Sequence, residues 1–141
     1  MPSTPQNHER PRIRVVAGAV VRAGQVLVAR RVAGVQRGDL WELPGGKVQE
    51  PESDARALCR ELNEELGIDV GITGLLGVSD FDYPDLSIRL VGLSCRLIGG
   101  VPEAREHAEL RWVGPEELDA LVWAPADVPL LEPLKVLLRN C

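Results

Sequence analysis

Three glutamates near the middle of the chain, Glu61, Glu64 and Glu65, have the spacing needed to act together on a cation. At positions i, i+3 and i+4 of a helix, their carboxylates share one face. Like charges at this spacing repel each other by roughly 0.2 to 0.5 kcal/mol per pair, and the negative end of the helix dipole also disfavours Glu64 and Glu65. Oxygen ligands are preferred by Mg²⁺ and Mn²⁺, and a bound ion would reverse this repulsion. We therefore expect a divalent metal site rather than an ordinary solvated face.

The segment from Ser53 to Leu66 is predicted to be the helix that carries these glutamates. Ser53 and Asp54 at its start supply acceptors and negative charge where free N–H groups favour them. Gly67 then ends the helix. The apolar residues recur at helical spacing and predict one buried stripe: Ala55, Leu58, Cys59, Leu62 and Leu66.

Two features next to this helix could support the metal site. Arg60 lies four residues before Glu64, where it can pair with that carboxylate and hold its orientation. The Gly45-Gly46 pair follows a short predicted strand, residues 40–43, and permits the main chain to come close to the helix. A backbone carbonyl of this loop could therefore bind the same ion.

The other segments predict a sheet around the helix. Apolar and β-branched runs at 13–22 and 25–30, joined at Ala23-Gly24, suit a hairpin. Further strands are expected at 72–80, 86–97 and 110–113. Pro115 opens a short helical turn, and 128–139 is expected to be a closing helix. Strands with one central and one terminal helix predict a mixed α/β sandwich.

Composition limits the class of protein. The 141 residues fit one domain, expected over 12–141, after a flexible N-terminal tail at 1–11. A net charge of −5 disfavours binding to duplex nucleic acid, and no apolar run is long enough to cross a membrane. Three widely spaced cysteines fit neither a disulfide framework nor a zinc site, so a reducing cytoplasm is the expected location. The chain is expected to be a monomer or a homodimer.

A longer motif surrounds the three glutamates. The pattern G-x5-E-x7-R-E-U-x-E-E-x-G-U, where U is a bulky aliphatic residue, runs from Gly46 to Ile68 without exception. It resembles the Nudix box. Residues 41–48 resemble the segment before the box in the MutT branch, and residues 124–131 resemble the tail of CTP pyrophosphohydrolases of that branch. The resemblance implies a Nudix-type α/β/α sandwich with a mixed sheet, a catalytic loop–helix–loop and a C-terminal helix.

The resemblance also implies roles for the motif residues. Glu61, Glu64 and Glu65 would bind Mg²⁺, for which Mn²⁺ can substitute, with the Gly45 carbonyl as a further ligand. Glu52 and Arg60 would support that site. A further carboxylate from across the cleft corresponds to Glu106 in the Glu106-His107 pair, with Glu109 as the alternative.

Four residues are expected to bind substrate. The resemblance implies that Arg31 binds the substrate at the end of the second strand, that Leu43 packs on the base and that Asp127 meets the base edge. Lys47 is a candidate phosphate partner, as is Arg31, whose guanidinium can form two parallel contacts.

The expected reaction is Mg²⁺-dependent hydrolysis of a nucleoside triphosphate to the monophosphate and pyrophosphate. Such a reaction depends on charge neutralisation and on placing a water in line with the phosphate. The metal would lower the pKa of this water, and a nearby carboxylate would accept its proton. Glu61 and Glu106 are both candidates for that catalytic base, and the sequence leaves this choice open.

The expected base depends on Asp127. An ionised carboxylate only accepts hydrogen bonds, so it favours the amino group of cytosine over the carbonyl oxygen of uracil or thymine. Cytosine nucleotides are therefore ranked first and oxidised guanine nucleotides such as 8-oxo-dGTP second. An N-cap role for Asp127 is the structural alternative. Two other functions remain open: ADP-ribose hydrolysis, with Pro84 in the position of a proline found in such enzymes, and noncatalytic regulation by nucleotide binding.

Overall fold

A computed structural model describes residues 10–140 of the chain. Most of the expected tail, residues 1–9, lies outside the described part. Arg10, within the expected tail, donates hydrogen bonds to the Tyr83 carbonyl (2.7 Å) and to Ser87 Oγ (2.9 Å). The elements follow in the order β1 (Arg12–Arg22), β2 (Gln25–Arg31), β3 (Trp41–Glu42), β4 (Gly45–Lys47), α2 (Asp54–Leu66), β5 (Asp69–Asp82), β6 (Ser87–Gly99), β7 (His107–Val113), the 3-10 helices η1 (Pro115–Ala120) and η2 (Pro125–Leu130), and α3 (Leu131–Arg139).

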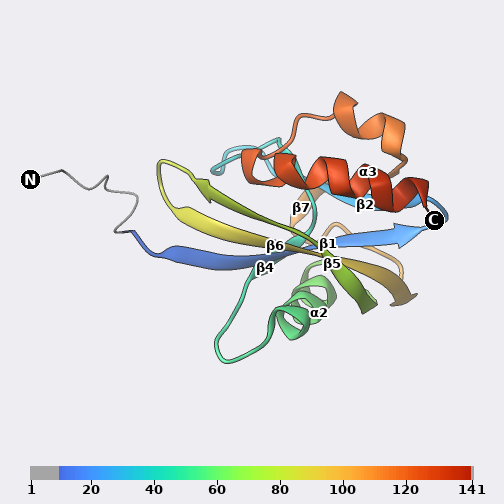
Figure 1. The fold of residues 1–141 in the computed structure, drawn as a ribbon, viewed down its shortest axis with the longest axis horizontal. Helices are drawn as coiled ribbons and strands as arrows, with labels where there is room; N and C mark the ends of the chain where they lie inside the picture. Colours follow the sequence, from blue (N-terminus) through green and yellow to red (C-terminus); the bar gives the residue numbers. More distant parts are fainter. Residues whose placement is uncertain (1–9, 141) are drawn as a thin grey trace, which may run out of the picture.

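The strands form one mixed sheet between two helical layers. Its order is β3-β2-β1-β6-β5, with β4 paired to β1 and β7 paired to β2. Strands β1 and β6 are parallel, and the other pairs are antiparallel. Helix α2 covers one face, while α3 and the 3-10 helices cover the other (Figure 1). The predicted α/β/α sandwich with a mixed sheet and a C-terminal helix is confirmed.

Strands β1 and β2 separate soon after their hairpin. They are paired only at Val21 with Val26 and at Arg22 with Gln25. Beyond that point, residues 15–17 of β1 pair with β4, whereas β2 pairs with β3 and β7. The Gly18 amide donates to the Pro44 carbonyl at 2.8 Å, which ties the chain to β1 where the strands part. The segment that contains Gly45 and Gly46 is therefore part of the sheet, as strand β4.

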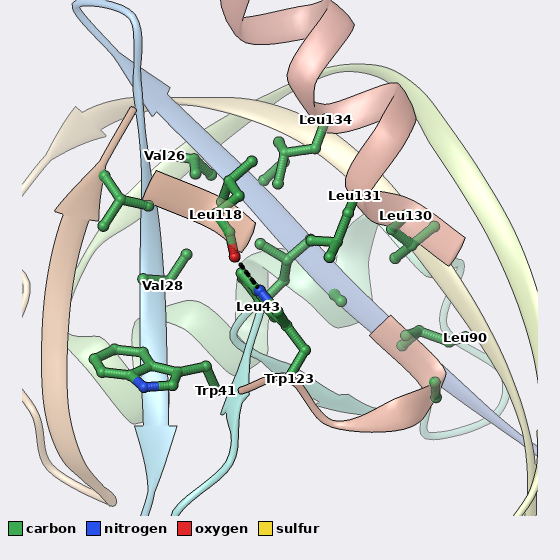
Figure 2. Close-up of a cluster of buried hydrophobic side chains, with 14 of the residues drawn as sticks. Val26, Val28, Trp41, Leu43, Leu90, Leu118, Trp123, Leu130, Leu131 and Leu134 are labelled. Atoms are coloured by element: carbon green, nitrogen blue, oxygen red, sulfur yellow. Dashed lines mark hydrogen bonds between the residues drawn. The ribbon is translucent and has the colours of Figure 1, made fainter. Parts of the chain in front are cut away.

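Each face of the sheet has its own buried core. Under α2, three leucines of the helix are fully buried against β1: Leu58, Leu62 and Leu66. Burying such a side chain contributes roughly 1.5 to 3 kcal/mol, so this packing fixes the helix that carries the glutamates. The opposite cluster joins β2 and β3 to α3, and in it Trp123 Nε1 donates to the Leu118 carbonyl at 2.7 Å (Figure 2).

The predicted central helix is confirmed at both ends. Ser53 Oγ accepts from the Arg56 amide at 3.2 Å, and Gly67 adopts the left-handed conformation with φ of 70°. Its buried stripe differs in detail, because Ala57 is buried while Ala55 and Cys59 are only half-buried.

The closing helix begins later than predicted. Its α-helical part starts at Leu131, and the preceding residues form the 3-10 helix η2. Pro133 has no N–H to donate, so it is tolerated in the first turn of a helix that begins at Leu131 but would interrupt the interior of one that begins at 128.

Candidate active site

Arg60 organises the acidic face of α2. Its guanidinium bonds to Glu52 at 2.7 and 3.0 Å, and Nη1 donates to both Glu61 Oε2 and Glu64 Oε1 at 3.1 Å. Nη2 also donates to the Lys47 carbonyl at 3.1 Å. The hydrogen bond from Arg60, helped by the Gln49 amide, holds the pKa of Glu52 below its usual range. Arg60 therefore fixes the carboxylates relative to one another and to β4.

The two glycines of β4 permit close contact with strand and helix. A Cβ at Gly45 would lie 1.9 Å from the Val16 carbonyl oxygen, and one at Gly46 would lie 2.4 Å from the carboxyl carbon of Glu61. Any side chain at these positions would displace the loop or the carboxylate. The predicted close approach of the glycine loop to the helix is confirmed.

Negative charge accumulates around Glu65. Burial, a hydrogen bond with Glu61 and the charges of Glu61, Glu106 and Glu42 raise the pKa of Glu65 to about 9. The carboxyls thus offer oxygen donors whose mutual repulsion a divalent cation would relieve. Within residues 10–140, no three His, Cys, Asp or Glu side chains are grouped so as to hold a metal ion; Arg60 instead bridges Glu61 and Glu64. The donor chemistry and the charge excess nonetheless fit a hard cation.

Two cavities meet beside these carboxylates. The first, which we call the acidic cavity, has a volume of about 340 Å³ and is lined by Glu65, Glu106 and His107 among others. The second, the apolar cavity, has a volume of about 310 Å³ and extends along β1 and β6 to Asp127. Four residues line both: Arg31, Glu42, Gly45 and Gly46. The two cavities are therefore adjacent parts of one elongated site.

Asp127 lines the apolar cavity but not the acidic cavity. Its side chain is buried, and Oδ2 accepts a hydrogen bond from the Leu43 amide at 2.9 Å. No side-chain cap hydrogen bond is formed at η2, so the N-cap alternative is wrong. Burial, reinforced by the charge of Glu42, raises the pKa of Asp127 to about 8. This shift favours the neutral carboxyl at pH 7, which can donate as well as accept, whereas the predicted base preference rests on the ionised form.

The other predicted substrate residues also lie at the elongated site. Leu43 and Lys47 line the apolar cavity, Leu43 as a buried side chain and Lys47 as an exposed one. Arg31 lies between the cavities, where Nη2 donates to the Gln36 carbonyl at 2.9 Å and Nη1 to Glu42 Oε1 at 3.4 Å. Among the described residues, Arg31 is thus the basic side chain that lines both cavities.

The two candidates for the cross-cleft carboxylate differ in their surroundings. Glu106 lines the acidic cavity with Glu65. Glu109 lies on β7 and bonds to Arg30 at 3.3 Å and to Arg111 at 2.8 Å. The geometry therefore favours Glu106 over Glu109 for that role.

Four residues that were not predicted as site residues also shape the site: Glu42, His107, Arg37 and Tyr83. Glu42 Oε2 lies 2.9 Å from His107 Nε2, and the buried Nδ1 of His107 has no hydrogen-bond partner among the described residues. At the apolar cavity, the Arg37 guanidinium lies 4.2 Å from the centre of the Tyr83 ring, whose hydroxyl accepts from the Ala126 amide. Glu42 directly precedes Leu43-Pro44 and could have been inferred from that adjacency; Arg37 stands in a loop and gave no signal.

Comparison with known proteins agrees with this arrangement. The model of the NUDIX domain matches residues 12–134. The chain belongs to the Nudix family. Among its relatives, this Nudix hydrolase is 40% identical to the CTP pyrophosphohydrolase of Escherichia coli K12, over 85% of this chain and 89% of that protein. It is 35% identical to an 8-oxo-dGTP diphosphatase of Haemophilus influenzae, over 86% and 90% of the two chains.

A solved structure extends the similarity to the fold. The solution structure of the E. coli ORF135 protein matches the Nudix hydrolase with a TM-score of 0.79 and 37% identity, covering 92% of this chain and 93% of that one. Among the described residues, no helix has the length and apolar character to cross a membrane.

Proposed function

We propose that this Nudix hydrolase is a Mg²⁺-dependent nucleoside triphosphate pyrophosphohydrolase, which releases a nucleoside monophosphate and pyrophosphate. The observation that carries the proposal is the pair of adjacent cavities. The apolar cavity of about 310 Å³ is lined by the buried Asp127 carboxyl among mostly apolar residues and suits a nucleoside. The neighbouring cavity is lined by carboxylates and Arg31, as a metal-bound triphosphate requires.

The residues that would hold Mg²⁺ are Glu61, Glu64 and Glu65 of α2, with Glu106 from the opposite side and the Gly45 carbonyl. The ion would neutralise phosphate oxygens and lower the pKa of the attacking water. Arg60 keeps the carboxylates of α2 in position through Glu52. Arg31 is placed to bind a phosphate oxygen at the junction of the cavities.

The proton of the attacking water requires a carboxylate base, and Glu61 and Glu106 remain the two candidates. Glu61 is held by Arg60 and packed against Gly46, so its position is well defined. Glu106 comes from outside the helix and lines the acidic cavity. Comparing the pH profiles of Glu61→Gln and Glu106→Gln decides between them, because only loss of the base removes the acidic limb of kcat while leaving metal affinity measurable.

Cytosine nucleotides are the first substrate class proposed and 8-oxo-dGTP the second. The neutral Asp127 carboxyl can donate one hydrogen bond and accept another. Cytosine offers an amino donor beside a ring acceptor, and oxidised guanine offers N–H donors beside carbonyl oxygens. Uracil offers a similar pair to the neutral acid, so the preference for cytosine over uracil depends on the ionised form of Asp127. The two named relatives act, according to their names, on these two kinds of nucleotide.

The test is product analysis with the purified protein and no added pyrophosphatase. CTP, dCTP, 8-oxo-dGTP, UTP and ADP-ribose are each incubated with and without Mg²⁺, and the products are resolved by anion-exchange chromatography and ³¹P NMR. Monophosphate and pyrophosphate in equal amounts are expected. Stoichiometric nucleoside diphosphate and orthophosphate would refute the proposal, and turnover of ADP-ribose alone would replace it with the alternative hydrolase.

A further inference from the structure

The carboxyl end of α2 has an unusual charge arrangement. A cation is favourable at this end of a helix, yet the last turn contains no basic residue and instead carries Glu64 and Glu65. The cation comes from elsewhere in the chain. Arg105, in the segment between β6 and β7, donates from Nη1 to the carbonyls of Asn63 at 3.4 Å and Glu64 at 3.3 Å.

The same segment makes further contacts with the helix end. The Glu103 amide donates to the Leu66 carbonyl at 2.9 Å, and Glu103 Oε1 accepts from Arg105 Nη2 at 2.9 Å. The first of these bonds satisfies a carbonyl that the end of a helix leaves without an intrahelical partner, and the second holds the Arg105 guanidinium in place. The segment is thus attached to α2 by its main chain as well as by a side chain.

Two glycines allow this close packing. A Cβ at Gly67 would lie 2.6 Å from Arg105 Nη2, and one at Gly100 would lie 2.5 Å from the Gly67 carbonyl oxygen. Because neither position has room for a side chain, the segment from Gly100 to Arg105 rests directly on the end of α2. Glu106 is the next residue, and it lines the acidic cavity with Glu65.

We propose that Arg105 is a positioning residue, which docks the segment carrying Glu106 onto the carboxyl end of α2 and so places Glu106 opposite Glu65 to bind the divalent cation. Arg105 touches neither cavity in the described structure. It acts through Glu106 by fixing the main chain one residue earlier. The inference rests on the proposed metal dependence.

The direction in which metal affinity changes when Arg105 is replaced distinguishes a positioning role of Arg105 from a purely electrostatic one. A positive charge near a cation site repels the ion, so removing Arg105 would strengthen metal binding if charge alone mattered. Loss of a positioning contact acts in the opposite direction. Removing groups that orient metal ligands typically weakens affinity about 10- to 100-fold.

The experiment measures binding of Mn²⁺ alone to the full chain by electron paramagnetic resonance, without nucleotide. Arg105→Gln removes the charge and the guanidinium contacts while keeping a polar side chain, and it is expected to weaken binding roughly tenfold. Arg89→Gln is the matched control, because Arg89 is similarly exposed (53% against 49%), pairs with a neighbouring carboxylate and lines neither cavity. It is expected to bind Mn²⁺ as the wild type does.

A double-mutant cycle with Glu106→Gln completes the test. If Arg105 acts through Glu106, Arg105→Gln has little further effect once Glu106 is replaced. Unchanged or tighter binding by Arg105→Gln in the wild-type background overturns the inference, as does an equal loss in both backgrounds. Should Arg105→Gln be unfolded by circular dichroism, Arg105→Lys carries the same test, since one ammonium cannot reproduce the fork of contacts. A wild-type protein that does not bind Mn²⁺ refutes the proposed metal dependence itself.

Discussion

Replacing Asp127 with asparagine should stabilise the protein, by an amount that grows with pH. The side chain is buried, and its pKa of about 8 lies far above the ordinary value of 3.8. Between these two values the unfolded chain releases the proton and the folded one retains it. The contribution of Asp127 to the free energy of unfolding is therefore fully present below pH 4 and is lost as pH rises through 8. Asparagine stays neutral and avoids this loss.

The magnitude follows from the same two values. Each unit of difference between the folded and unfolded pKa of Asp127 corresponds to about 1.4 kcal/mol. Between pH 4 and 8, the free energy of unfolding of the wild type therefore falls by up to about 1.4 kcal/mol per pH unit relative to that of Asp127→Asn. The maximum difference is on the order of 6 kcal/mol above pH 9 and about 4 kcal/mol at pH 7. The hydrogen bond from the Leu43 amide is retained, because the amide oxygen of asparagine can accept it.

The measurement is urea unfolding of both proteins at pH 4.5, 6, 7.5 and 9. Titration of groups that do not interact with Asp127 cancels in the difference between wild type and variant, so its pH dependence reports Asp127 together with its coupling to Glu42. A difference that is constant over this range would refute the argument, because it would mean that the carboxyl ionises normally in the folded protein. Lower stability of the variant at pH 9 would have the same consequence.

Three further predictions concern activity. Glu64→Gln should lose several orders of magnitude in turnover while melting at the same or a higher temperature, because a repelling charge is removed and Arg60 keeps an acceptor. The control is Glu50→Gln, which should keep wild-type turnover. If Glu64→Gln keeps more than about a tenth of wild-type turnover, a barrier change under ~1.4 kcal/mol, the metal-site assignment is wrong. The ratio of kcat/KM for CTP to that for UTP should rise between pH 6.5 and 8.5, because ionised Asp127 accepts from the cytosine amino group and repels the uracil carbonyl. In Asp127→Asn the ratio should not change with pH. A wild-type ratio that does not change with pH would exclude the base-reading role of Asp127. Arg37→Ala should raise KM a few-fold with kcat unchanged, because it removes a side chain that lines the apolar cavity. The control is Arg22→Ala, which breaks a similar contact with Trp112 at 4.1 Å and should change neither constant. An unchanged KM for Arg37→Ala would count against a role of Arg37 in substrate binding.

The sequence predicts α2 and its neighbourhood well because the relevant forces are local. The spacing of leucines, the Ser53 cap and the Gly67 terminus each depend on residues within one or two helical turns. The positions of most strands follow from apolar runs in the same way, whereas β4 has no apolar run and is predicted only as a glycine loop. The motif around Glu61 then places the acidic face on that helix.

Contacts between distant segments are what the sequence leaves undetermined. The ionisation of Asp127 depends on burial and on Glu42, 85 positions earlier, and neither is visible in a local pattern. The last turn of α2 contains no basic residue, and no local pattern shows that Arg105, about 40 positions later, supplies the positive charge at the end of this helix. Arg37 meets Tyr83 only because the loop after β2 folds toward the turn between β5 and β6.

The pairing of β4 with β1 has a consequence for how this site can change over evolutionary time. Gly45 and Gly46 pair with the central strand and have no room for side chains. Substitutions at these two positions would disrupt the fold and would therefore be removed by selection. The 32–40 loop, which supplies Arg37 to the apolar cavity, contains no strand, and the main-chain atom nearest to a Cβ at Gly38, the Val32 carbonyl oxygen, lies within the loop itself. New substrate preferences would therefore arise through the loop, while the end that carries the proposed metal ligands is inherited unchanged.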